Sequence, residues 1–440
     1  MENKQVMKKT FGIMTAITMV VGTVIGSGIF FKPQAIYTAT GGKPGLGMIA
    51  WLITGLVSIA AALTFAEIAI LIPKTGGMVE YLSEVFGERV GYLAGWMQVV
   101  LALPAMAAGL AVIFADQVTL LTGNNVTIPV AIFVLIFVVI LNCMSSKVGG
   151  GVQVVFTICK LVPLVLIIVF GFIKGSGTNT VFTPMVGEGL STITVLGTLM
   201  VAILFAFEGW TNVGAIAGEM KNPGRDLPIA IVGGVSVITA IYFIINLAYL
   251  WVIPADQLAA TSAPATLVAR HIFGDFGSIL ITIGIMISCF GTCNGFLMSG
   301  SRVTYAMAEG GKLPFFKFLS KLNKTQTPAN SIIFTGALSC IFALTGQYNL
   351  LTDLGVFSSW IFYTLTFVAV IVYRKQRPDI KRSYKVPLYP IIPILAIISG
   401  IFVVLNQFIT ATMLSLGSVI ITLIGLPVYI YMNKKHMSNS

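Results

Sequence analysis

Long apolar stretches, separated by short polar breaks or by glycine and proline, run along almost the whole chain. Each stretch is close to the 20 or so apolar residues that an α-helix needs to cross a bilayer core of about 30 Å. These stretches lack the residue-by-residue alternation of a membrane β-barrel. We therefore predict an all-α integral membrane protein with twelve spans, at residues 11–37, 45–72, 91–121, 126–143, 151–173, 193–220, 228–253, 277–307, 329–346, 351–373, 388–409 and 411–432.

The composition excludes an ordinary soluble enzyme. Of the 440 residues, 57% are hydrophobic and only 9% are charged, whereas soluble domains have about 25% charged residues. Twelve spans with short loops use up the length, so residues 1–440 are predicted to form a single membrane domain. The polar start at Met1–Thr10, with no small-residue cleavage site after the first apolar stretch, predicts no removable signal peptide.

Membrane topology explains the net charge of +11. If the N-terminus is cytoplasmic, 21 of the 26 Lys and Arg residues fall on the cytoplasmic side, four on the other side and one, Lys160, within a span. Because Lys and Arg are retained on the cytoplasmic side, we predict that both termini are cytoplasmic. The basic residues lie on short loops beside lipid headgroups, so membrane lipid is an expected partner and nucleic acid is not.

Two predicted spans are interrupted at matching positions. Gly26-Ser27-Gly28 breaks the first span, and the sixth carries an acid, Glu208, and a glycine within 205–210. The breaks are five spans apart. Because five is an odd number of crossings, the second set of five spans starts from the opposite side of the membrane and forms an inverted repeat of the first set. Close packing of small residues could explain the first break alone, but it does not explain why the sixth span is broken at the matching position. Matched broken helices indicate a transporter with a binding site near the bilayer midplane.

The two breaks offer complementary charges. Unwinding at Gly26–Gly28 frees N–H groups at the positive end of the following half-helix, where a carboxylate binds well. Unwinding at 205–209 frees carbonyl groups, which suit an ammonium group. A site with both is complementary to a zwitterion, so we predict an α-amino acid as the substrate.

Two ionisable residues lie deep in predicted spans. Lys160 is about nine residues into the fifth span, roughly 13 Å from its end, too deep for its ammonium to reach the headgroups. It is expected to replace a bound cation or to carry a proton, the alternative being a structural tether. Glu208 either orders the unwound backbone or lines the substrate path. Glu67, near the end of the second span, is more typical of a loop anchor, and Tyr242 in the seventh is a weaker candidate.

Other function classes find little support in the sequence. An intramembrane enzyme would lack its commonest base, because His271 and His436 fall in a loop and a tail. Cys289 and Cys293 have no neighbouring His or carboxylate to complete a metal site, and no nucleotide-binding loop is present. We therefore expect neither a metal nor a cofactor. A channel fits broken helices and a zwitterion-shaped site less well than a carrier does.

Six spaced motifs resemble the amino acid, polyamine and organocation superfamily. The resemblance covers nearly the whole chain, and it is closest to the L-type amino acid transporter branch, which includes bacterial serine/threonine and alanine/serine/cysteine exchangers. The motifs are Gly26–Phe30, Ala66–Ile68 with Ile72–Gly77, Phe205–Trp210, Glu219–Pro223, Ser301–Ala308 with Leu313-Pro314, and Arg377–Asp379 with Tyr384–Pro387.

The resemblance implies a LeuT-type fold. Residues 11–173 and 193–373 would form two inverted repeats of five helices, with helices 1 and 6 broken, and residues 388–432 would add two more helices. It also implies sodium-independent exchange of small neutral L-amino acids across the cell membrane by alternating access. The alternative is a proton- or sodium-coupled symporter of amino acids or polyamines.

The resemblance also implies roles for individual residues. Amides at Gly26–Gly28 would bind the substrate carboxylate, and carbonyls at Val24, Phe205 and Glu208 would bind its ammonium group. Phe205 would be the aromatic gate over the substrate. Lys160 would fill the place that a sodium ion takes in sodium-coupled relatives.

The side-chain pocket is expected to set the choice among amino acids. We predict that Phe207, Tyr242 and Asn294 contribute to it, which suits small or medium neutral side chains such as those of alanine, serine, cysteine and threonine. The position of Glu208 is often a small residue in the branch. We expect its carboxylate to be tied into helix packing or protonated, so that arginine and lysine do not compete.

One departure from the branch concerns partners. Animal members are joined by a disulfide to an ancillary glycoprotein through a cysteine in the loop between spans three and four. The corresponding loop here, residues 121–127, has no cysteine. This implies a single-chain, prokaryote-like carrier with no disulfide-linked subunit.

Overall fold

The chain folds into helices throughout. The computed structural model describes residues 7–177 and 180–437, and every regular element within them is an α-, 3₁₀- or π-helix. The one pairing of extended backbone in those residues is a bridge between Phe11 and Met220. Large apolar side chains such as Ile173 and Ile193 lie exposed on helix surfaces, which suits contact with lipid. The predicted all-α membrane fold is confirmed.

The first half of the chain contains the first broken helix. Local signals end and begin its helices: Gly123, at φ 72°, closes α6, and the Ser145 side chain accepts a hydrogen bond from the amide of Val148 at the start of α8. The elements are α1 (Ile13–Val24), α2 (Gly28–Ala39), α3 (Gly45–Leu71), α4 (Met78–Phe86), α5 (Glu88–Met97), the π-helical η1 (Gln98–Ala102), α6 (Leu103–Thr122), α7 (Thr127–Met144) and α8 (Ser146–Lys174).

The second half contains the other broken helix and the long central helix α14, which packs along α6 and α8. Its elements are α9 (Thr192–Ala206), the 3₁₀-helical η2 (Trp210–Glu219), α10 (Pro223–Pro228), the π-helical η3 (Ile229–Gly233), α11 (Gly234–Val252), α12 (Ala255–Ala260), α13 (Pro264–Phe273), α14 (Asp275–Glu309), α15 (Phe316–Leu319), α16 (Ala329–Ala343), α17 (Tyr348–Gln376), α18 (Ile391–Thr410), α19 (Thr412–Leu423) and α20 (Gly425–Met437).

The number of spans differs by one from the sequence prediction. Within the described residues, eleven helical segments are long and apolar enough to cross a membrane. The remaining predicted span, 329–346, corresponds to α16, which has 15 residues. A helix of that length rises roughly 22 Å, less than the ~30 Å of a hydrocarbon core. The twelfth crossing therefore stays a prediction.

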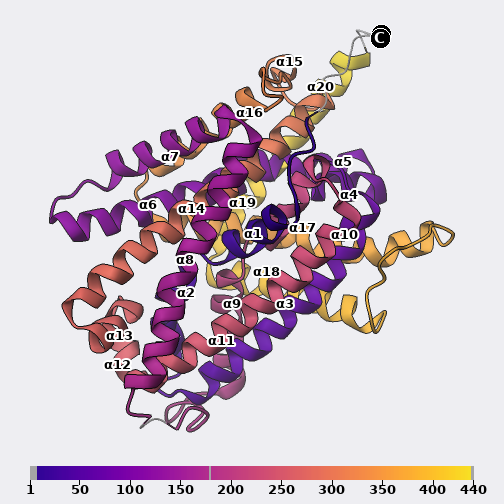
Figure 1. The fold of residues 1–440 in the computed structure, drawn as a ribbon. Helices are drawn as coiled ribbons and strands as arrows, with labels where there is room; N and C mark the ends of the chain where they lie inside the picture. Colours follow the sequence, from indigo (N-terminus) through magenta and orange to yellow (C-terminus); the bar gives the residue numbers. More distant parts are fainter. Residues whose placement is uncertain (1–6, 178–179, 438–440) are drawn as a thin grey trace.

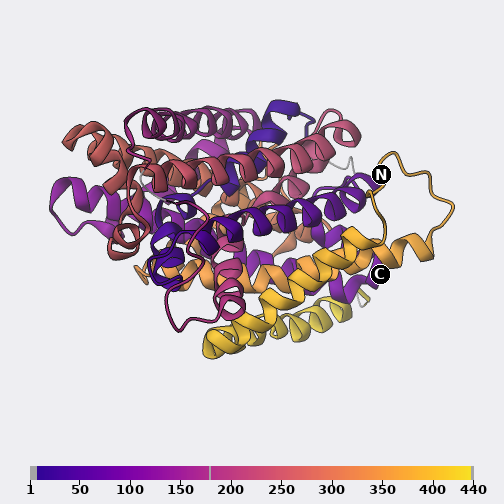
Figure 2. The same ribbon diagram turned by 90° about the horizontal axis from the view of Figure 1, so that it is seen from below.

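The helices form one bundle with two distinguishable ends. α15 and α20 lie at one end, and α12 and α13 lie at the other (Figure 1). The two termini lie on the same side of the bundle (Figure 2). We call the end with α15 and α20 the terminal end, and the end with α12 and α13 the distal end.

Backbone hydrogen bonds fix the N-terminal segment to the end of η2. The amides of Thr10 and Phe11 donate to the carbonyl of Glu219 at 2.9 and 3.0 Å, and the amide of Lys221 donates to the carbonyl of Phe11 at 2.9 Å. Residues 10 and 11 are therefore attached to the second half of the sixth predicted span.

Candidate functional site

The first break brings free amides to the centre of the bundle. α1 ends at Val24 and α2 begins at Gly28. Among the described residues, the amides of Ser27, Gly28 and Ile29 have no acceptor. The amide of Gly26, which the sequence prediction included among the carboxylate ligands, instead donates to the carbonyl of Val24 at 2.8 Å. Gly28 is needed for close packing, because a Cβ there would lie 2.8 Å from the Cβ of Ala206. The break thus presents N–H donors at the positive end of α2, an arrangement suited to a carboxylate.

The second break lies directly beside the first. α9 ends at Ala206, and η2 begins at Trp210. Gly209, between them, has φ 115°, which side-chain-bearing residues rarely adopt, and a Cβ there would come within 2.9 Å of the Thr23 carbonyl oxygen. The Thr23 hydroxyl donates to the carbonyl of Gly209 at 2.9 Å. The predicted interruption of both spans is confirmed, and a hydrogen bond joins the two breaks.

Tyr242 bridges the two breaks from α11. Its hydroxyl lies 3.1 Å from the carbonyl oxygen of Val24 and 3.0 Å from that of Ala206. The ring of Phe207 packs edge-on against the Tyr242 ring, with centroids 5.1 Å apart. Tyr242 and Phe207 therefore hold the two half-helices together and do not line the cavity between them, where the sequence placed them.

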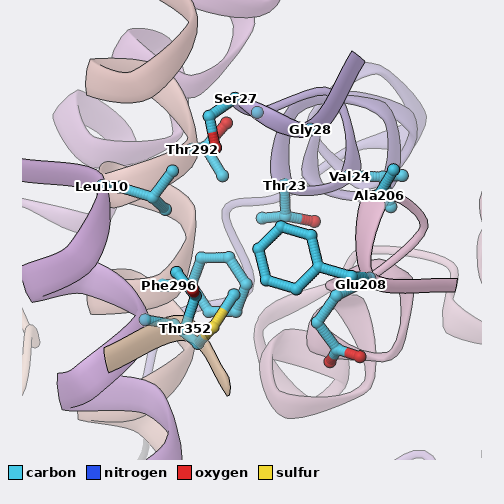
Figure 3. Close-up of a pocket in the computed structure, with 13 residues that line it drawn as sticks. Thr23, Val24, Ser27, Gly28, Leu110, Ala206, Glu208, Thr292, Phe296 and Thr352 are labelled. Atoms are coloured by element: carbon cyan, nitrogen blue, oxygen red, sulfur yellow. The ribbon is translucent and has the colours of Figure 1, made fainter. Parts of the chain in front are cut away.

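A small cavity lies between the breaks (Figure 3). Its volume is about 20 Å³, room for about one water molecule, so an amino acid would enter only if the surrounding helices moved apart. Six of the predicted site residues line it, namely Val24, Gly26, Ser27, Gly28, Phe205 and Glu208. The lining residues that the sequence did not indicate are Thr23, Met106, Leu110, Ala206, Thr292, Phe296 and Thr352.

The two carboxylate oxygens of buried Glu208 have different surroundings. Oε1 accepts a hydrogen bond from the Tyr363 hydroxyl at 2.5 Å, and that hydroxyl accepts one from Thr211 at 2.8 Å. Oε2 has no hydrogen-bond partner in the part of the chain that the structure describes. The carboxylate points away from Ser27 (Figure 3). One oxygen is thus tied to α17, and the other is an unsatisfied acceptor.

Lys160 is surrounded by oxygen atoms beside the first break. It is fully buried, and its Nζ donates to the carbonyls of Gly22 and Ile25 at 2.7 Å and of Ser288 at 3.1 Å. The Thr292 hydroxyl oxygen lies 2.8 Å from the same Nζ. A buried ammonium is stable only with such hydrogen bonds. Lys160 therefore ties α8 to the unwound end of α1 and to α14.

Asn294 lies in a separate polar network, not in the cavity lining. Its Nδ2 donates to Oε1 of Gln153 at 2.8 Å, and its Oδ1 accepts from Nδ2 of Asn142 at 2.8 Å. Nε2 of Gln153 donates in turn to the carbonyl of Thr18 at 3.2 Å. The amide of Asn294 joins α14 to α7 and α8. Thr292 and Phe296, two residues to either side, face the cavity instead.

The distal side of the cavity is closed by a thin layer. A vestibule of about 610 Å³, lined by α2, α6 and the start of α17, extends from the distal end as far as Gly28. A hydrogen bond between the hydroxyls of Ser27 and Tyr348 crosses the inner end of this vestibule. The distal path therefore reaches almost to the central cavity.

The terminal side is closed by a thicker layer. Arg302 and Glu219 form a fully buried ion pair, with Nε and Oε1 2.7 Å apart. Arg302 also donates to the Ser146 hydroxyl at 2.9 Å and lies over the ring of Phe11. A hollow of about 340 Å³ at this end does not reach the breaks. Burial raises the pKa of Glu80, which lines this hollow, above its usual range.

Two broken helices that meet beside a central cavity are the arrangement of a secondary transporter. The chain matches the amino acid permease family over residues 11–432 and belongs to that family. It is accordingly a multi-pass membrane protein, and the predicted superfamily is confirmed.

Individual relatives cover nearly the whole chain. The protein is 41% identical to the serine/threonine exchanger SteT of Bacillus subtilis over 436 residues, 98% of each chain. It is 31% identical to the b(0,+)-type amino acid transporter 1 of Mus musculus over 414 residues, 92% of this chain and 83% of that one. It is 30% identical to the cystine/glutamate transporter of Homo sapiens over 438 residues, 97% and 86% of the two chains. These relatives are named as transporters and exchangers, not enzymes.

Proposed function

We propose that the protein is a sodium-independent exchanger of small neutral L-amino acids such as alanine, serine, cysteine and threonine. The observation that carries the proposal is the set of free amides at Ser27, Gly28 and Ile29 beside the central cavity. The name of the B. subtilis relative, a serine/threonine exchanger, supports exchange and the substrate class.

The backbone at the breaks would bind the part that all amino acids share. The substrate carboxylate would accept from the free amides of α2. The Val24 carbonyl already accepts from the amide of Gly26 at 2.8 Å, and it shares the single hydroxyl proton of Tyr242 with the carbonyl of Ala206. We therefore assign the ammonium group mainly to the carbonyls of Phe205 and Glu208, with Val24 as a minor contributor.

The walls of the cavity would select the side chain. Met106, Leu110 and Phe296 supply apolar surface, and the Thr352 hydroxyl donates to the carbonyl of Tyr348 at 3.0 Å. The backbone contacts cannot distinguish one amino acid from another, so selectivity depends on these walls. A narrow, largely apolar wall favours small neutral side chains.

Lys160 supports independence from sodium. Its ammonium group occupies the space between the Gly22, Ile25 and Ser288 carbonyls, which a hard cation would otherwise fill, because such ions prefer oxygen ligands. Because the Lys160 ammonium group supplies a positive charge at this position, no sodium ion is needed there.

The terminal end of the bundle would face the cytoplasm in a prokaryotic cell membrane. The excess of Lys and Arg on the predicted cytoplasmic loops supports this orientation. Residues 11–173 and 193–373 would act as inverted repeats, each with its first helix broken, and residues 388–432 would add two helices. We propose that no disulfide-linked second subunit is needed.

A proton-coupled symporter is the second candidate. The observation that favours it is the unpartnered Oε2 of buried Glu208 at the edge of the cavity. Such an oxygen could take up a proton together with the substrate.

Uptake into proteoliposomes tests the proposal. Radiolabelled serine should enter vesicles preloaded with unlabelled serine and not empty vesicles, and the rate should be the same in sodium and in choline. Accumulation in empty vesicles under an imposed proton gradient would instead support the symporter. Failure to transport any amino acid under either condition would contradict both candidates.

A further inference from the structure

A lysine that has no part in the mechanism above lies against the predicted gate residue. Lys32 is on α2, five residues beyond Ser27 towards the distal end. Its Nζ lies 4.0 Å from the centroid of the Phe205 ring. This distance is well within the range of a cation–π interaction, in which the negative face of the ring attracts the ammonium group.

Lys32 lies between the distal vestibule and the gate. It lines the vestibule together with Gly28 and Tyr348. It also lines a smaller cavity of about 60 Å³ that it shares with Phe205 and Asp353. Phe205 in turn lines the central cavity. Lys32 therefore borders both the vestibule and the small cavity beside the gate residue.

Asp353 supplies the opposite charge. It is half-buried on α17, next to Thr352 of the central cavity, and lines the same small cavity as Lys32. An ammonium group away from bulk water is costly unless an opposite charge accompanies it. A negative charge on Asp353, which lines the same small cavity, therefore lowers the cost of a charged Lys32 on the face of the ring.

We propose that Lys32 is a positioning residue of the gate: its ammonium group, balanced by Asp353, holds the Phe205 ring over the central cavity. This inference rests on the proposed function, because it takes Phe205 as the gate. The interaction is expected to change the ratio of closed to open gate by roughly two- to thirty-fold. Loss of the charge opens the gate from the distal side and leaves the amides of α2 unchanged.

Thiol labelling of the central cavity in intact cells tests the inference. Thr352→Cys introduces a target thiol in the cavity wall, and a reagent that does not cross the membrane is added outside. The labelled peptide is measured by mass spectrometry, which separates it from the five native cysteines. In this background we expect Lys32→Met, which keeps the length of the side chain, to speed labelling roughly two- to thirty-fold.

Three further variants separate the charge from other effects. Lys32→Arg keeps a cation that stacks on aromatic rings, so labelling stays at the rate of the unmodified lysine. Asp353→Asn speeds labelling less than Lys32→Met does. The double variant is labelled no faster than Lys32→Met, because Asp353 acts only through the charge of Lys32. Lys174→Met is the matched control: its Nζ lies 5.6 Å from the Phe273 ring at the distal end, away from the vestibule, and labelling should not change.

Several outcomes overturn the inference. Unchanged labelling in Lys32→Met, equal acceleration in Lys32→Arg, or equal acceleration in Lys174→Met would each do so. If Lys32→Met does not reach the membrane, unchanged labelling in Asp353→Asn is decisive against it. Labelling needs no substrate, so faster labelling combined with no amino acid exchange by the protein that retains Thr352 counts against the proposed function and not against the role of Lys32.

Discussion

Replacement of Lys160 by methionine is expected to remove most transport. Methionine keeps most of the length of the side chain but donates no hydrogen bond. The carbonyls of Gly22 and Ile25, at the unwound end of α1, would each lose a bond of 2.7 Å to a charged donor. The hydroxyls of Ser288 and Thr292 lie 2.9–3.1 Å from these carbonyls, but each has a single proton to share among several acceptors.

The size of the effect follows from these two bonds. Hydrogen bonds to charged groups contribute roughly 1.5–3 kcal/mol each, so the lower bound for two is about 3 kcal/mol. That corresponds to a factor of about 150 in the population of the observed break geometry. If only this geometry binds substrate, the apparent affinity falls by about the same factor.

The assay is exchange of radiolabelled serine in preloaded proteoliposomes, with size-exclusion chromatography to check folding. Lys147→Met is the matched control, since Lys147 is exposed on the same helix, and it should exchange at the wild-type rate. Exchange by Lys160→Met within about threefold of wild type would refute the reasoning. Strong sodium dependence of the wild-type protein would equally contradict a resident positive charge at this position.

Three other expectations can be checked in the same preparations. Phe205→Ala removes the ring that covers the cavity, and exchange should collapse; near-normal turnover would mean that the substrate binds elsewhere. Excess arginine should not reduce serine exchange, because Glu208 is tied to Tyr363; inhibition equal to that by alanine would contradict a neutral substrate. Glu219→Gln leaves Arg302 buried without its counter-charge, so the free energy of unfolding should fall by roughly 3–5 kcal/mol. Thermal unfolding in detergent measures this loss, and an unchanged midpoint temperature would show that the ion pair is dispensable.

The backbone features of the site could be predicted from the sequence. Gly28 and Gly209 mark the breaks because glycine is required where a Cβ would strike Ala206 or the Thr23 carbonyl. Such requirements are local, and they are visible as glycine within an otherwise apolar helix. A lysine as deep as Lys160 is equally conspicuous, because a lone charge in an apolar span needs partners.

The side chains around the cavity could not be predicted in the same way. α14 is buried over most of its length, so no polar stripe distinguishes its cavity face from its packing faces. The predicted pocket residue Asn294 uses its amide to bind Asn142 and Gln153, and Thr292 faces the cavity instead. Tyr242 is close to the site but joins the two breaks. These differences depend on helix rotation, which tertiary packing sets.

The attachment of the N-terminal segment to the end of η2 offers a spectroscopic handle. Because Thr10 and Phe11 are hydrogen-bonded to Glu219, any displacement of η2, the second half of the second broken helix, also displaces the residues immediately before Thr10. Lys8 and Lys9 are exposed there, so a dye attached at either one would report any displacement of η2 without entering the bundle. Paired with a second dye elsewhere on the bundle, it would record such displacements in single molecules as changes in energy transfer.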